Sequence, residues 1–182
     1  MVDFTVAICT YNGEKRLPDV LDRLRSQIDT ENISWEIIVV DNNSQDDTAK
    51  VVQEYQEDWD KPYPLTYCFE QRQGAAFARK KAIKEANSPL IGFLDDDNLP
   101  NSYWVASAYN FAQKHPQAGA FASLIQGDFE VEPPPNFNRI KAFLAITERG
   151  NKARLYNPKF KLLPPSAGLV AVSYTHLRAH ET

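Results

Sequence analysis

Six short runs of apolar and small residues recur along the chain and alternate, over the first two thirds of it, with segments that have a helical repeat. The run at residues 4–9 shows no clean alternation of apolar and polar positions, which is typical of a strand covered on both faces. We predict strands over residues 4–9, 35–40, 65–69, 89–94, 120–125 and 167–172.

Between these strands, apolar residues return every three or four positions, as they do in an amphipathic helix. The first such stripe consists of Leu17, Val20, Leu21, Leu24 and Ile28. Further helices are predicted over residues 48–55, 77–86, 100–115 and, as a short amphipathic helix, 137–144.

Two prolines bear on the fourth helix, because Pro100 suits its first turn and Pro116 marks its end. Strands that alternate with helices imply right-handed crossovers and a mostly parallel sheet. The predicted fold class is therefore α/β, with a mostly parallel central sheet and helices on both faces.

Length and composition are those of one globular domain: 182 residues, 43% apolar and 24% charged. The net charge is −4 and no concentrated basic stripe is present, so we expect no nucleic-acid partner. Cys9 and Cys68 lie in apolar runs and are too few for a disulfide scaffold, and no run of about 18 apolar residues exists. These features predict a cytoplasmic setting.

The last ten residues, 173–182, fit neither a strand nor a convincingly striped helix. They resemble a translated vector or adapter sequence, so we exclude them from the predicted fold. The expectation is one domain over residues 1–172, followed by a non-native tail, with the native chain continuing differently after about Val172.

Polar and acidic residues follow three of the predicted strands at their carboxyl ends. They are residues 10–12 after the first strand, 41–44 after the second and 95–98 after the fourth. Because ligands of parallel α/β sheets bind beyond the carboxyl ends of the strands, we expect these segments to meet at one edge of the sheet.

The three adjacent carboxylates Asp95, Asp96 and Asp97 repel one another unless a cation lies nearby. Mg²⁺ usually takes one or two carboxylates together with substrate phosphates, and it would neutralise a diphosphate leaving group. The alternative is a solvated acidic turn.

A calcium loop of the EF-hand type fits worse, because Leu99 and Pro100 stand where an oxygen ligand and a glycine are needed. A phosphatase with an aspartyl nucleophile also fits worse, because the first strand ends in Thr-Tyr-Asn.

The residues after the second strand allow two interpretations. Helix capping and favourable first-turn charge account for Ser44, Asp46 and Asp47. Asp41 precedes the cap, so its carboxylate could accept hydrogen bonds from a base or a ribose. Arg79, in the helix that follows Gly74, could reach a phosphate at the same edge.

Taken together, residues 6–12, 39–48 and 93–97 strongly resemble the family 2 glycosyltransferases, over roughly residues 3–172. The sequence is also similar to enzymes of hormogonium polysaccharide synthesis. The resemblance implies the GT-A fold, a Rossmann-like sheet that binds a nucleoside-diphosphate sugar donor with Mg²⁺ or Mn²⁺.

By this resemblance, Thr10 and Asp41 would lie near the nucleobase, Asp96 near the ribose and Asp97 on the metal. The remaining donor-binding residues would be Tyr11, Asn12, Arg79 and Asp95, which is the first Asp of the DXD pattern.

The resemblance also implies an inverting transfer to a saccharide or lipid-linked acceptor. The catalytic base is expected downstream of Val172, and Glu148 is a poor substitute. We therefore predict a C-terminally truncated chain that binds donor but transfers poorly, with membrane association at the inner face through the missing part. The alternative is a non-catalytic module that binds nucleotide sugars or carbohydrate.

The two cysteines offer a check on the implied strand order. If the second strand lies between the first and third, Cys9 and Cys68 are separated by two strand spacings, about 9–10 Å. That distance exceeds the reach of a disulfide, so both thiols are predicted to be free.

Overall fold

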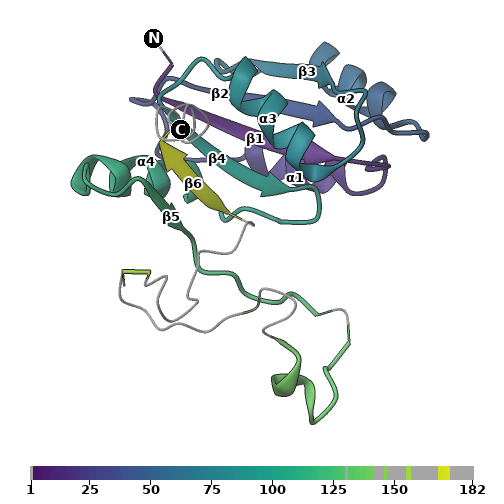
Figure 1. Ribbon diagram of the computed structural model, residues 1–182. Helices are drawn as coiled ribbons and strands as arrows, with labels where there is room; N and C mark the ends of the chain where they lie inside the picture. The colour runs from purple at the N-terminus through teal and green to yellow at the C-terminus, as the bar shows by residue number, and fades with distance from the viewer. Residues whose placement is uncertain (1, 130, 142–145, 147–154, 157–167, 173–182) are drawn as a thin grey trace.

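The computed structural model describes residues 2–129, 131–141, 146, 155–156 and 168–172. The predicted non-native tail, residues 173–182, and the candidate Glu148 lie outside these ranges. In the described part of the chain, the elements form one sheet with helices packed on it (Figure 1).

The six strands of this sheet run in the order β3-β2-β1-β4-β6-β5. The first four are mutually parallel, whereas β6 is antiparallel to both β4 and β5. The mostly parallel α/β architecture predicted from the sequence is confirmed. The strands are β1 (Phe4–Thr10), β2 (Trp35–Asp41), β3 (Leu65–Phe69), β4 (Leu90–Asp95), β5 (Ala120–Ala122) and β6 (Leu169–Val172).

Four α-helices cover the two faces of the sheet. A core on one face joins α1, α2 and α4 to the side chains of Phe4, Val6 and Ile8. A second core on the other face joins α3 to Ala7 and its neighbours, and α3 crosses the sheet on that side (Figure 1). The helices are α1 (Leu17–Arg25), α2 (Thr48–Glu57), α3 (Ala75–Glu85) and α4 (Trp104–Lys114).

The two cores explain why β1 lacks a polar alternation. Successive side chains of a strand point to opposite faces, and both faces are covered. Packing is close enough that Gly92 of β4 has no room for a side chain. A Cβ atom there would lie 2.7 Å from the rings of both Phe4 and Trp104.

Most boundaries agree with the sequence predictions to within two residues, and four differ by more. Helix α1 ends at Arg25, and Ile28 lies beyond it, partly exposed, with its N–H bound to the carbonyl of Ser102. Pro100 lies outside α4, which begins at Trp104.

The other two differences concern the segment after α4. Strand β5 ends at Ala122 and does not reach residue 125. Of the helix predicted over 137–144, residues 137–141 are described, and they contain a 3₁₀ turn, Phe137–Arg139, held by short backbone bonds. The chain leaves the sheet in this region (Figure 1).

The strand order confirms the cysteine prediction. Cys9 pairs with Val40, and Val40 pairs with Cys68, so one whole strand separates the two thiols. Both cysteines are free. Within the described residues, no helix has the length and apolar character needed to cross a bilayer.

Candidate functional site

The carboxyl ends of β1, β2 and β4 lie side by side and bring the predicted segments together. Thr10 pairs with Asp41 in the β1–β2 register, and Cys9 pairs with Asp95 across β1 and β4. The hydroxyl of Thr10 also donates a hydrogen bond of 2.5 Å to Oδ2 of Asp96. Thr10 therefore stands between the acidic residues of the two neighbouring strands.

Asp96 is held by an arginine that the sequence did not single out. Nε of Arg16 donates to Oδ1 at 3.0 Å and Nη2 donates to Oδ2 at 2.9 Å, which is a bidentate pair. The same Nη2 reaches the carbonyl of Tyr11 at 3.1 Å. The hydrogen bond to Asp96 raises the pKa of Arg16, and the guanidinium stays charged.

Asp95 and Arg79 form a second, longer pair, with Nη2 of Arg79 3.3 Å from Oδ1 of Asp95. Burial raises the pKa of Asp95, the Arg79 charge lowers it, and the charges of Asp97 and Asp96 add to the increase. Arg79 thus lies at the acidic edge, where its guanidinium is paired with Asp95. The sequence predicts a phosphate contact for this residue.

Asp97 is the most open carboxylate of the three. Its side chain is exposed, and its Oδ1 accepts a hydrogen bond of 3.1 Å from the side-chain amide of the neighbouring Asn98. Among the described residues, no salt bridge reaches Asp97 or Asp41. Asp97 therefore has most of its acceptor capacity available to a ligand.

Asp41 is buried, with 3% of its surface exposed, and its hydrogen-bond partners among the described residues are neutral. Oδ1 accepts the N–H of Ser44 at 2.8 Å and Oδ2 accepts the hydroxyl of Tyr67 at 2.8 Å. Burial, and then this hydrogen bond, raise the pKa of Tyr67 above its usual range, so the phenol is protonated and donates.

The loop after β1 and the loop after β2 are tied together by crossing hydrogen bonds. The N–H of Asn12 donates to Oγ of Ser44, and Oδ1 of Asn12 accepts the N–H of Gln45. Gly13 N–H donates to Oγ1 of Thr48 at 2.8 Å. Asn12, predicted to bind the donor, thus has its side chain engaged in holding the two loops.

These contacts correct the capping interpretation. Ser44 accepts from Asn12 and not from the backbone of α2, and no side-chain cap is made by Asp47 at the N-cap position. Only Asp46 bonds the start of the helix, accepting from the N–H of Thr48, and it also accepts from Glu14. The competing contact, from a loop more than thirty residues away, was not visible in the local pattern.

The donor set fits a divalent cation that is shared with a phosphate ligand. Among the residues that the structure describes, no group of three or more His, Cys, Asp or Glu side chains forms a complete metal cage. Exposed Asp97 and half-buried Asp95 supply one or two carboxylate oxygens, which is what Mg²⁺ takes when phosphates complete its coordination. The residues present therefore fit Mg²⁺ or Mn²⁺ bound together with a nucleotide.

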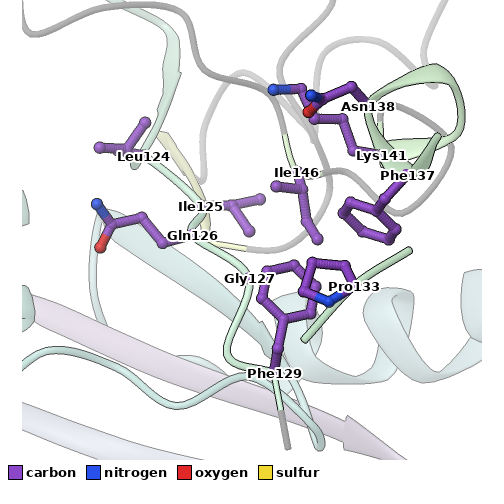
Figure 2. A pocket seen from close by; sticks show the side chains of 10 residues that line it. All are labelled: Leu124, Ile125, Gln126, Gly127, Phe129, Pro133, Phe137, Asn138, Lys141 and Ile146. Carbon is purple, nitrogen blue, oxygen red and sulfur yellow. The ribbon is translucent and has the colours of Figure 1, made fainter. Parts of the chain in front are cut away.

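A cavity of about 660 Å³ lies elsewhere, between the chain after β5 and the 3₁₀ turn (Figure 2). Its lining is mostly apolar and includes Leu124, Phe129 and Phe137, with Lys141 at its edge. None of the described residues that line it carries a carboxylate, so the acidic edge of the sheet fits a cation with a diphosphate better.

Comparison with known proteins gives one family and several relatives. A family model described as glycosyl transferase family 2 matches residues 5–172. Poly(ribitol-phosphate) beta-N-acetylglucosaminyltransferase TarS of Staphylococcus aureus is 29% identical over 115 residues, 63% of this chain and 20% of that protein.

Two further relatives are shorter matches at higher identity. The putative teichuronic acid biosynthesis glycosyltransferase TuaG of Bacillus subtilis is 38% identical over 89 residues, 49% of this chain and 33% of that protein. GalNAc(5)-diNAcBac-PP-undecaprenol beta-1,3-glucosyltransferase of Campylobacter jejuni is 33% identical over 100 residues, 54% of this chain and 30% of that protein. The chain thus spans a third or less of these relatives.

Solved structures show the same architecture. S. aureus TarS 1–349 in complex with UDP has a TM-score of 0.72 at 20% identity, over 98% of this chain and 49% of that one. This likeness confirms the predicted GT-A-like fold. The mannosyltransferase PcManGT of Pyrobaculum calidifontis, in complex with GDP-Man and Mn²⁺, has a TM-score of 0.61 at 28% identity, over 68% of this chain and 35% of that one.

Proposed function

The chain belongs to glycosyl transferase family 2, and from this premise we propose that it is the donor-binding part of a glycosyltransferase. It binds a nucleoside-diphosphate sugar whose sugar is transferred to a hydroxyl of a saccharide or lipid-linked acceptor. The observation that carries the proposal is the position of Thr10, paired in register with Asp41 and hydrogen-bonded to Asp96. Residues from three strand ends thereby form one acidic edge where parallel α/β sheets bind ligands.

Each part of this edge suits one part of the donor. Buried Asp41 accepts N–H groups of a base. Thr10 pairs with Asp41 in register, and exposed Tyr11 follows Thr10 in the chain. Asp96 accepts a ribose hydroxyl. Arg79, paired to Asp95 at 3.3 Å, is close enough to the edge to exchange that contact for a phosphate oxygen.

Asp97 would hold Mg²⁺ or Mn²⁺, because it is the carboxylate with the most free acceptor capacity. When bound, the cation supplies charge stabilisation to the departing diphosphate. The chain's own residues orient the donor and keep the Arg79 guanidinium near the developing charge. A structural relative solved with GDP-Man and Mn²⁺ supports this choice of ion.

The proposed transfer also needs a catalytic base and an acceptor. We expect this base downstream of Val172, where the resemblance to the family places it. A relative named for an undecaprenol-linked substrate supports a lipid-linked acceptor, and with it attachment at the inner face of the membrane. Assignment to the hormogonium polysaccharide type also stays a prediction.

Isothermal titration calorimetry with UDP and GDP sugars, with and without Mn²⁺, tests the proposal. We expect binding of one nucleotide class that needs the metal and that Asp97→Ala weakens by at least about tenfold, the loss of one charge-assisted contact. Asp60→Ala is the matched control, because Asp60 is an exposed acid in the loop that leads into the amino end of β3, and the acidic edge is at the carboxyl ends of the strands. Metal-independent sugar binding, unchanged in Asp97→Ala, would favour the non-catalytic binding module instead.

A further inference from the structure

Arg16 occupies the N-cap position of α1 and joins the loop after β1 to the acidic segment after β4. Eighty residues separate it from Asp96 in the sequence. We propose that Arg16 is a positioning residue, which fixes the Asp96 carboxylate for one hydroxyl of the nucleotide ribose. This inference rests on the proposed function, since it concerns the same donor site.

The geometry of the pair leaves Asp96 one orientation. Arg16 donates to both carboxylate oxygens, at 3.0 and 2.9 Å, and Thr10 donates to Oδ2 from the other side. A carboxylate offers about four acceptor positions, and these three donors fill three of them. One acceptor position on Oδ1 therefore remains, which suits a single hydroxyl donor.

Arg16 is itself held in place. Its Nη2 group also donates to the carbonyl of Tyr11, so the guanidinium bridges the loop backbone and the carboxylate. The planar guanidinium matches a carboxylate with two parallel hydrogen bonds, which an ammonium group does not reproduce.

Gly13 allows the loop after β1 to approach Thr10 and Asp96 closely. A Cβ atom at Gly13 would lie 2.0 Å from Oγ1 of Thr10 and 2.9 Å from Oδ2 of Asp96. The backbone of the loop therefore packs directly against the Thr10–Asp96 contact. The turn that carries Arg16 closes one side of the carboxylate and limits its rotation.

A competing role for Arg16 follows from its exposure. Its side chain is 46% exposed, so it could release Asp96 and bind the diphosphate directly. The two roles differ in which nucleotide group must be present for Arg16→Ala to weaken binding. A positioning role depends on the ribose hydroxyls, whereas a phosphate contact does not.

The test measures Mn²⁺-dependent binding of UDP and GDP, and of their 2′,3′-dideoxy analogues, by calorimetry. We expect Arg16→Ala to weaken the ribonucleotide that binds by about tenfold, the value of a charge-assisted hydrogen bond. The same substitution should change the dideoxy analogue by less than about twofold. Arg16→Lys should recover only part of the lost affinity, because lysine keeps the charge but lacks the two parallel N–H donors of the guanidinium.

Two controls make the result decisive. Arg23→Ala removes an exposed arginine of the same helix and should leave both affinities unchanged. In an Asp96→Asn background, Arg16→Ala should cost little more, because the two residues act as one unit. An equal loss for ribose and dideoxy forms would overturn the inference. If the wild-type chain bound neither UDP nor GDP, the proposed function itself would fail.

Discussion

The two ends of the central sheet both carry acidic side chains, but their charges are balanced in different ways. At the amino end, Glu36 of β2 is buried and accepts hydrogen bonds from the Thr5 hydroxyl and from the N–H and side-chain amide of Asn87. Ser88 completes the cluster through Thr5. Both Glu36 oxygens have partners from the protein itself.

At the carboxyl end, four carboxylates face two guanidinium groups. Arg16 pairs with Asp96 and Arg79 with Asp95, while Asp41 and Asp97 have no salt bridge among the described residues. Like charges this close are costly unless an opposite charge joins them. Burial of a carboxylate is therefore no sign of function by itself. A site is indicated where carboxylates outnumber the cationic side chains at the ligand-binding edge of the sheet.

The largest effect is expected at the amino end. Glu36→Ala should lower the free energy of unfolding by about 2–4 kcal/mol, because it leaves buried donors without an acceptor. Urea denaturation measures this, and nucleotide affinity of the folded protein should not change. Glu36→Gln keeps the shape and one acceptor, so it should cost less. Weakened nucleotide binding with unchanged stability would contradict a purely structural role for Glu36.

A methyl group added at Gly13 should disturb the carboxyl end. Gly13→Ala forces the Thr10–Asp96 contact apart, which should cost about 1–3 kcal/mol of stability and also weaken UDP or GDP binding. Gly92→Ala is the matched control, since its Cβ meets Phe4 and Trp104 in the core. The control should lose stability and keep nucleotide affinity. Equal binding losses in both variants would show that the site merely follows global stability.

The smallest effect is expected at Glu70, just after β3. Its carboxylate is paired with the guanidinium of Arg72. Hydrogen bonds from Arg72 lower the pKa of Glu70 to about 2. A lowered carboxyl pKa contributes stability above its unfolded value, 4.5, and loses it as the pH falls towards 2. Wild type and Glu70→Gln should therefore differ in urea stability at pH 7 and converge near pH 2. A difference that persists at low pH would contradict this.

The regular part of the fold could be predicted because local pattern and final packing agree. The stripe Leu17, Val20, Leu21 and Leu24 is buried in α1 as expected. Ile28 continues the spacing but not the helix, since the backbone turns at Ser26 to reach the loop before α4. The periodicity of side chains does not report such a backbone contact.

The candidate site was predictable only in part for a similar reason. Strand order places Thr10, Asp41 and Asp95 at one edge, and in the sequence each directly follows a predicted strand. Arg16 lies in a polar turn beside Lys15 and looks like a solvated charge. Its partner, Asp96, is brought to it only by folding.

One measurement tests the excess of acid at the carboxyl end most directly. Mn²⁺ added with UDP or GDP broadens nearby amide signals in nuclear magnetic resonance spectra. We expect the strongest broadening at Asp95–Asp97, Thr10 and Asp41, and much weaker broadening at Glu36, which lies about 16 Å from Asp41 along β2. Broadening centred on Glu36 and Asn87, or spread evenly over the surface, would contradict it.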